Sequence, residues 1–285
     1  MIYVALSVIC SVLVSVLLKL ARRFSVDIGQ AVAWNYAVAS VLTSLVLRPP
    51  LTMLRDPTAP WLALAGLAVL LPTIFLVLAA SVRHAGIVRS DAAQRLSLLI
   101  SLLAAFVIFG EKLDLLKGAG IVLGLLALLC MVWRSERVAA SDGASAWVYP
   151  LVVLAGFAAI DILFKRVAQA GLPLGASLQA MFLFSLVVAL VLPLWHRVRG
   201  RSVFTRRSAL AGVALGLANF GNILFYLRAH RALPQHPALI FASTNIGVVA
   251  LGALIGVLVF REQLSRLNFG GVLMALAAIG MIAWS

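Results

Sequence analysis

The chain has 285 residues, of which 64% are hydrophobic and 11% are charged, and its mean hydropathy is +1.11. An ordinary soluble domain is about 45–50% apolar and about 25% charged, so a water-soluble fold is excluded and most of the surface must face lipid. The net charge of +14 does not indicate nucleic acid, because the 23 Lys and Arg lie in short connections between apolar runs. We therefore expect a lipid bilayer, and no nucleic acid, as a partner.

Ten apolar runs are long enough to cross a membrane, because a helix needs about 20 mostly apolar residues to span the hydrocarbon core. The runs are continuously apolar, as in residues 120–132, whereas a membrane strand alternates polar and apolar positions. The sequence therefore predicts an all-α, multi-pass integral membrane protein with ten transmembrane helices. In chain order, the predicted spans are residues 2–19, 28–47, 60–82, 88–109, 115–133, 146–165, 174–195, 207–228, 236–260 and 267–285.

Small residues recur at helical spacing within several of the spans, which lets neighbouring helix backbones approach closely. We expect such close packing at three glycine pairs: Gly120 with Gly124, Gly212 with Gly216, and Gly252 with Gly256. This pattern is common in membrane helices and says nothing about a substrate.

The sequence contains no motif of a soluble enzyme or a metal site. Cys10 and Cys130 lie inside apolar runs without metal-ligand or redox spacing, and neither a Gly-x-Ser-x-Gly nor a His-Glu-x-x-His motif occurs. We therefore predict no catalytic residues, no bound metal and no cofactor. A membrane enzyme that modifies lipids would need Asp, His or Arg side chains clustered at one interface, whereas the nine acidic residues are scattered.

The two halves of the chain contain a repeated segment. A shift of 151 residues aligns residues 109–133 with residues 260–284 without a gap. Eight of these 25 positions are identical. They include two pairs that apolar composition alone does not explain: Glu111 with Glu262, and Trp133 with Trp284.

The repeat predicts two units of five helices each, residues 1–140 and residues 141–285. Because five is an odd number, the second unit must cross the membrane in the inverted sense relative to the first. Inverted repeats of this kind are a recurring plan of secondary transporters, in which the substrate site lies at the interface of the repeats.

Two further features occur in both halves. Lys19 and Lys165, which align at a shift of 146, each close the first span of their half, and residues 109–113 and 260–264 both read aromatic-x-Glu-x-Leu. With these features the whole chain resembles the EamA-type ten-helix members of the drug/metabolite transporter superfamily. The resemblance implies a secondary transporter that moves a small metabolite or drug by alternating access, coupled to a proton gradient or working by exchange.

The connections between spans bear on orientation. After odd-numbered spans they hold 15 of the 23 Lys and Arg, and after even-numbered spans they hold 8. The positive-inside rule then favours odd-numbered connections in the cytoplasm and both termini outside. Ten spans in any orientation place both termini on the same side, and we expect the protein in the inner (plasma) membrane of a bacterium.

Polar residues inside the spans are the candidates for function, because a charge at the bilayer centre costs at least about 2.5–3.5 kcal/mol on insertion scales. Asp161, in the predicted span 146–165, is the clearest of them. As a protonatable carboxylate it is our candidate for coupling transport to a proton, or for pairing with a cationic substrate. The alternative is a structural ion pair with Lys165, four residues further on.

Amide side chains form a second group of candidates. Gln94 and Asn245 align at the shift of 151, so they would face each other across a central cavity; the alternative is that each amide bonds a neighbouring helix. Asn219, Asn222 and Tyr226 are spaced by three and four residues, which places them on one face of a helix. That polar stripe is typical of a cavity lining.

Two more residues complete the predicted cavity. Thr244 adjoins Asn245, and Asn35 lies between Trp34 and Tyr36, where second helices of the family often carry an Arg. Substrate inferences that depend on that Arg do not transfer to this chain, and the two aromatic residues suit interfacial anchors as well as ligand contacts. The predicted cavity residues are Asn35, Gln94, Asn219, Asn222, Tyr226, Thr244 and Asn245, with Asp161 for coupling.

Other charged residues near span ends suit structural roles. Asp91 and Arg95 have the acid-then-base spacing of an ion pair at a helix start. Glu111 and Glu262 each end a span, where a carboxylate accepts hydrogen bonds from a helix start or pairs with the neighbouring Lys112 or Arg261. The function predicted from these patterns is transport of a small polar or amphipathic molecule, and the alternatives are a lipid flippase or a membrane scaffold that transports nothing.

Overall fold

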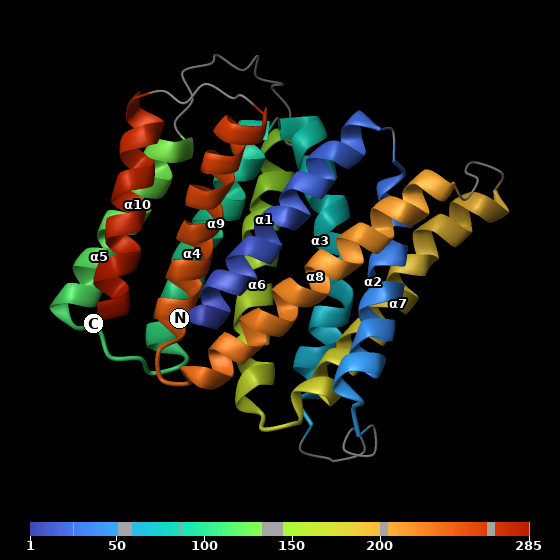
Figure 1. Cartoon of the computed structure of the whole chain (residues 1–285), viewed down its shortest axis with the longest axis horizontal. Coiled ribbons are helices and arrows are strands. Elements are labelled where there is room, and N and C mark those ends of the chain that lie inside the picture. Colours follow the sequence, from blue (N-terminus) through green and yellow to red (C-terminus); the bar gives the residue numbers. More distant parts are fainter. Residues whose placement is uncertain are drawn as a thin grey trace.

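The structure is a computed structural model that describes residues 1–24, 26–50, 59–85, 87–132, 145–199, 205–260 and 266–284. In these residues the chain forms ten helices, one at each predicted span (Figure 1). Their bounds are α1 Ile2–Arg23, α2 Ile28–Leu47, α3 Trp61–Ala85, α4 Ile87–Val107, α5 Leu115–Val132, α6 Ser145–Gln169, α7 Leu174–Val198, α8 Arg206–Ala232, α9 Pro237–Phe260 and α10 Arg266–Trp284.

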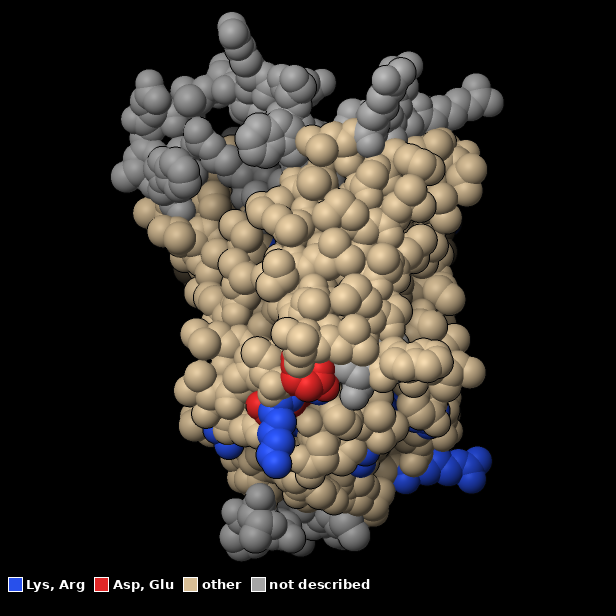
Figure 2. All heavy atoms as spheres, turned by 90° about the vertical axis from the view of Figure 1, so that its left-hand side faces the viewer, with Lys and Arg blue, Asp and Glu red and all other residues tan. Residues whose placement is uncertain are grey.

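Five of the ten helices, α2, α3, α7, α8 and α9, are long and apolar enough to cross a membrane, judged on the described residues. Shorter apolar stretches occur in α1, α4, α5 and α10. The surface agrees with this composition: Figure 2 shows the face on which α5 and α10 lie, with charged side chains toward one end and most of the face uncharged. Large apolar side chains are exposed there: Val122, Leu126, Leu129, Leu273 and Leu276.

Helices from the two halves of the sequence pack against one another throughout the bundle. Four pairs join one of the first five helices to one of the last five: α5 packs on α10 and α2 on α7, while α1 packs on α8 and α3 on α6. Figure 1 shows α5 and α10 side by side at one edge of the bundle, with α2 and α7 at the opposite edge. Both termini lie at the same end of the bundle (Figure 1).

Close backbone approach occurs at two of the three predicted glycine pairs. A Cβ atom at Gly216 would lie 2.8 Å from the carbonyl oxygen of Asn35, so α8 and α2 meet backbone to backbone. At Gly120 a Cβ atom would lie 2.7 Å from the Ile282 side chain, which confirms the prediction for α5 and α10. The prediction is wrong for Gly252, because among the described residues no atom of another helix lies within 4 Å of a Cβ at that position.

The starts of α2 and α8 are joined by interlocking caps. The Asp27 carboxylate accepts the backbone N–H of Gln30 at 3.1 Å, and the Thr205 hydroxyl accepts that of Ser208 at 3.2 Å. Each cap also reaches the other helix, because the backbone N–H of Asp27 donates to Ser208 Oγ and that of Thr205 donates to Gln30 Oε1, both at 3.1 Å. These bonds satisfy helix-terminal N–H groups and fix α2 beside α8.

Candidate functional site

A cavity of about 220 Å³ lies inside the bundle and is lined by seven helices: α1, α2, α3, α4, α6, α8 and α9. Half of its 22 lining residues carry polar or charged side chains, and the others are aliphatic or aromatic. Apolar walls with a few converging polar groups are typical of a site for a small molecule. The cavity is therefore the first candidate for a functional site.

Seven of the eight residues predicted for function line this cavity, although they come from four different helices. They are Gln94, Asp161, Asn219, Asn222, Tyr226, Thr244 and Asn245. The eighth, Asn35, does not line it. Asn35 lies in a void of about 10 Å³ next to the cavity, and Asn219 lines both spaces.

Asp161 links three helices at the cavity wall. The hydroxyl of Ser101, on α4, donates to Asp161 Oδ2 at 2.8 Å, and the hydroxyl of Tyr226, on α8, donates to Asp161 Oδ1 at 2.7 Å. Hydrogen bonds to an ionised acceptor are shorter and stronger than neutral ones. A carboxylate has about four lone-pair sites, so two remain for a proton or for a donor in the cavity.

Lys165 does not pair with Asp161, and that structural alternative is wrong. The Lys165 side chain is fully buried, at 0% exposure, and its Nζ donates to the backbone carbonyl of Pro234 at 2.6 Å. The physical reason is a competing acceptor, since the long Lys165 chain reaches the turn between α8 and α9. Asp161 therefore meets only hydroxyl donors among the hydrogen bonds of the described residues.

Two of the cavity amides are held by hydrogen bonds of different kinds. Ser7, on α1, donates to Asn222 Oδ1 at 2.9 Å, so this amide bonds a neighbouring helix. Asn245 Nδ2 donates to the carbonyl oxygen of Phe241 at 3.0 Å, one turn earlier in α9 itself. Both residues nevertheless line the cavity, as does Gln94.

Several buried polar atoms on the cavity-lining residues make no well-aligned hydrogen bond among the described residues. They include the Tyr36 hydroxyl, Asn219 Nδ2 and Thr244 Oγ1, in residues 0%, 5% and 9% exposed, and the Tyr36 and Asn219 side chains lie within reach of each other. The amide oxygen of Asn35, a residue that is 2% exposed and lies beside the cavity, likewise accepts no hydrogen bond among the described residues. Buried polar atoms are normally paired, so these orphans need an explanation.

Four polar residues line the cavity that the sequence did not place there: Ser11, Ser15, Tyr36 and Arg95. The spacing of Ser11 and Ser15, one turn apart on α1, was a usable signal. Tyr36 was weighed as an interfacial anchor, but it is buried and its aromatic neighbour Trp34, at 42% exposure, is the one that faces outward. Serines are too common in membrane helices for Ser101 to have been singled out.

A network of buried polar residues joins the connection before α5 to the start of α9. The side chain of Glu111 is 1% exposed, and its Oε1 atom lies 3.0 Å from Lys117 Nζ. Its Oε2 accepts the backbone N–H of Ala238, at the start of α9, at 2.6 Å. The prediction that Glu111 accepts from a helix start is confirmed, but its cationic partner is Lys117 and not the exposed Lys112.

Some predicted features lie outside the described residues. Glu262 and Trp133 belong to segments that the structure does not describe, and the side chains of Lys19, Asp91 and Phe260 are likewise outside it. The predicted pair of Asp91 with Arg95, and the second copy of the Glu111 contact, stay predictions.

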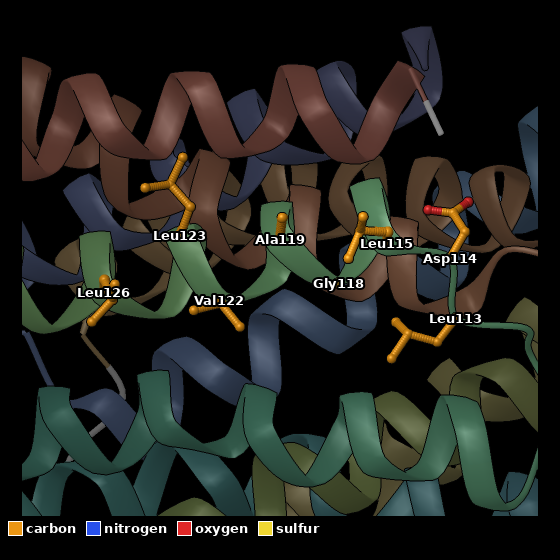
Figure 3. Close-up of a pocket in the computed structure, with 8 residues that line it drawn as sticks. All are labelled: Leu113, Asp114, Leu115, Gly118, Ala119, Val122, Leu123 and Leu126. Atoms are coloured by element: carbon orange, nitrogen blue, oxygen red, sulfur yellow. The ribbon is translucent and has the colours of Figure 1, made fainter.

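A larger but very different groove, of about 660 Å³, runs along the outer face of α5. Figure 3 shows its lining, which comes from one helix and the residues just before it: Leu113, Asp114, Leu115, Gly118, Ala119, Val122, Leu123 and Leu126. Apart from Asp114 these side chains are apolar, and the groove shares no residue with the polar cavity. An open apolar groove suits a lipid chain, whereas the cavity offers groups that recognise a polar molecule.

Metal-ligating side chains do not gather anywhere in the described part of the chain. Within it, no three of the His, Cys, Asp and Glu residues lie close enough to hold an ion. The chemistry of the cavity is therefore that of hydroxyls, amides, one carboxylate and one guanidinium.

The fold and the cavity can now be compared with known proteins. Over residues 1–133 the sequence matches the EamA-like transporter family. A Haemophilus influenzae protein described as uncharacterized is 39% identical over 280 residues, which is 96% of this chain and 94% of the relative. A solved crystal structure is similar with a TM-score of 0.74 over 99% of this chain and 96% of that one, and its 16% identity makes it evidence for the fold alone.

The family match agrees with the apolar helices described above, five of which are long enough to cross a membrane. A polar cavity inside a bundle of apolar helices is what a membrane transporter requires. The match over residues 1–133 therefore places the chain, through the EamA-like transporter family, in the drug/metabolite transporter superfamily, and the chain is a multi-pass integral membrane protein.

Proposed function

We propose that the protein is a secondary transporter that moves a small polar or amphipathic metabolite, or a drug, across the bacterial inner membrane by alternating access. The observation that carries this proposal is the cavity of about 220 Å³ with a carboxylate in its wall. A charged group inside a membrane bundle costs at least about 2.5–3.5 kcal/mol on insertion scales, so its presence beside a cavity favours a role in transport.

In this proposal all ten helices span the membrane, as two inverted units, residues 1–140 and 141–285. The packing supports it, because α1 packs on α8 as its counterpart α6 packs on α3, and α2, α4 and α5 each pack on their own counterparts, α7, α9 and α10. Such exchange of partners is expected from a twofold axis in the membrane plane. The two units would rock about the shared cavity and expose it to each side in turn.

Asp161 is the residue that we propose couples transport to a proton. A proton from one side would bind the carboxylate, and it would leave to the other side once the cavity has opened there. The Ser101 and Tyr226 hydroxyls would hold the carboxylate in place in both forms, since each hydroxyl both donates and accepts. The partners of the protein in this account are the bilayer, the substrate and the proton.

Reconstitution into proteoliposomes tests the proposal. The wild type is expected to move at least one compound of a metabolite panel saturably, and faster with a pH gradient. Asp161→Asn keeps the shape of the side chain but cannot carry the proton, so it is expected to abolish the response to pH. Asp114→Asn is the matched control, because Asp114 caps α5 outside the cavity and Asn caps equally well. An unchanged pH response in Asp161→Asn would show that the coupling role is wrong.

A lipid flippase is the second candidate, and the groove along α5 is the observation that favours it. A flippase must move a polar headgroup through the bundle while the chains stay in lipid. The groove and the polar cavity have no lining residue in common, which favours transport of a soluble molecule. Movement of fluorescent phospholipids between leaflets in the same proteoliposomes, without transport of any panel compound, would favour the flippase.

A further inference from the structure

The wall of the cavity formed by α2 and α8 contains two neighbouring polar groups whose hydrogen-bonding capacity the fold leaves largely unused. The Tyr36 hydroxyl and Asn219 Nδ2 lie within reach of each other but make no well-aligned hydrogen bond among the described residues, and both residues line the cavity. Thr244, on α9, also lines the cavity, and its Oγ1 likewise makes no hydrogen bond among the described residues. A buried donor without a well-placed acceptor destabilises a protein, so these groups are suited to bind a molecule that supplies the acceptor.

The backbone holds these groups in place. Gly216 brings α8 so close to α2 that a Cβ atom there would lie 2.8 Å from the Asn35 carbonyl oxygen. Asn219 follows Gly216 by three residues, so the same close contact places its amide beside α2. The Tyr36 ring packs against Phe182 with ring centroids 6.3 Å apart, which fixes the ring and hence the position of its hydroxyl.

The chemistry of the two groups differs from that of the Asp161 region. The Asn219 nitrogen only donates, and the Tyr36 hydroxyl donates or accepts. Two donors on neighbouring helices are complementary to one oxygen acceptor, whereas the Asp161 carboxylate is complementary to a donor or a cation. The cavity thus presents donors on one wall and an acceptor on another.

We propose that Tyr36 and Asn219 form a specificity subsite that donates hydrogen bonds to a carbonyl or carboxylate oxygen of the substrate. The proposal deepens the proposed transport function and rests on it. It makes Tyr36 a specificity-determining residue, and it assigns to the substrate an oxygen acceptor at one end and an amine donor, facing Asp161, at the other. The oxygen acceptor of a bound substrate would accept hydrogen bonds from these two groups. A compound without that acceptor would leave the two donors buried and without an acceptor.

Equilibrium binding to the purified full-length protein tests the subsite. The probes are phenylalaninamide, which carries an amine and a carbonyl, and phenethylamine, which carries the amine alone. Wild type is expected to bind phenylalaninamide about fivefold to tenfold more tightly than phenethylamine, which is the typical effect of one hydrogen bond. In Tyr36→Phe and in Asn219→Leu the ratio is expected to fall to about one to two, because one donor is gone and the other is weakly placed without it.

Stability separates this proposal from a structural role for the hydroxyl. Because the Tyr36 hydroxyl makes no well-aligned hydrogen bond in the fold, Tyr36→Phe is expected to keep or raise the Tm measured without a probe. Tyr149→Phe is the matched control, since Tyr149 stacks on His84 at 5.0 Å outside the cavity, and it is expected to keep the wild-type binding ratio.

Three results would overturn the subsite. They are a wild-type ratio retained in Tyr36→Phe, a lowered Tm in that variant, and no binding of either probe to wild type. Because binding is measured without transport, the outcomes stay distinct from those of the flux assay. A protein that shows the Tyr36-dependent ratio but moves no compound would contradict the transporter and leave the subsite standing.

Discussion

Asp161 shows how a single side chain acquires a role from its neighbours. The carboxylate lies in an apolar helix, and Ser101 and Tyr226 each donate one hydrogen bond to it. Neither donor carries a charge, so the negative charge is held without being cancelled. A carboxylate paired with Lys165 would have been a structural ion pair, whereas this one keeps capacity for a ligand or a proton.

Tyr226→Phe tests this arrangement. The variant removes one of the two donors to Asp161 while the ring keeps its contact with Phe164, at 5.6 Å between centroids. A hydrogen bond to a charged group contributes about 1.5–3 kcal/mol, so we expect proton-driven transport to fall about tenfold or more. The initial rate in proteoliposomes measures it, and the Tm shows whether the fold is intact. An unchanged rate would mean that the hydroxyl does not support the carboxylate during transport.

At the scale of single residues, the sequence was most informative where a polar type is rare. Asp161 and the stripe of Asn219, Asn222 and Tyr226 stand out in apolar spans, and the structure places all four at one cavity. The direction of Lys165 was not predictable, because its acceptor is a carbonyl on another helix. Asn35 has the right type and the right span, but its side chain lies behind Asn219 and not in the cavity.

The helix pair α2 and α8 shows what small residues do at the scale of elements. Without side chains at Gly212 and Gly216 the two backbones meet, and the interlocking caps at Asp27 and Thr205 fix the start of the same contact. The pattern of glycines predicted the contact but not its partner. The same spacing failed at Gly252, because helical periodicity says which residues share a face and not what that face meets.

Alanine substitution at two glycines compares these faces directly. Gly216→Ala places a methyl group 2.8 Å from a backbone oxygen, and overpacking of this kind costs about 1–3 kcal/mol. Gly252→Ala is the matched control, since it meets open space and gains up to about 1 kcal/mol in helix propensity. We expect the Tm to fall in the first variant and to hold or rise in the second. Equal Tm changes in the two would contradict the α2–α8 contact.

The whole molecule joins its two halves through buried polar contacts as well as through apolar packing. Glu111 comes from the connection between α4 and α5, and it accepts from Ala238 at the start of α9, in the other half of the chain. Within the second half, Lys165 and Arg231 donate to the carbonyls of Pro234 and Leu172, in the turns that precede α9 and α7. Hydropathy predicted the ten helices, but it contains no information on such contacts between distant loops.

Glu111→Ala tests the strength of this junction. The variant leaves the Lys117 charge buried without its partner and removes an acceptor from the start of α9. Breaking a buried pair by removing one partner costs about 3–5 kcal/mol, so we expect a large loss of Tm in detergent. Lys112→Ala is the control, because the exposed Lys112 makes no part of the network, and its Tm is expected to match wild type. A Glu111→Ala protein as stable as wild type would show that the junction does not hold the halves together.

Transport by alternating access requires that the polar cavity open to both sides of the membrane. The direct measurement is the reactivity of Asn222→Cys, in a chain whose Cys10 and Cys130 have been replaced by Ala, toward a membrane-impermeant thiol reagent. The reagent is applied to right-side-out and to inside-out vesicles. We expect the thiol to react from either side, and more slowly when a transported compound is present. Reaction from one side alone, with or without a pH gradient or a transported compound, would contradict it.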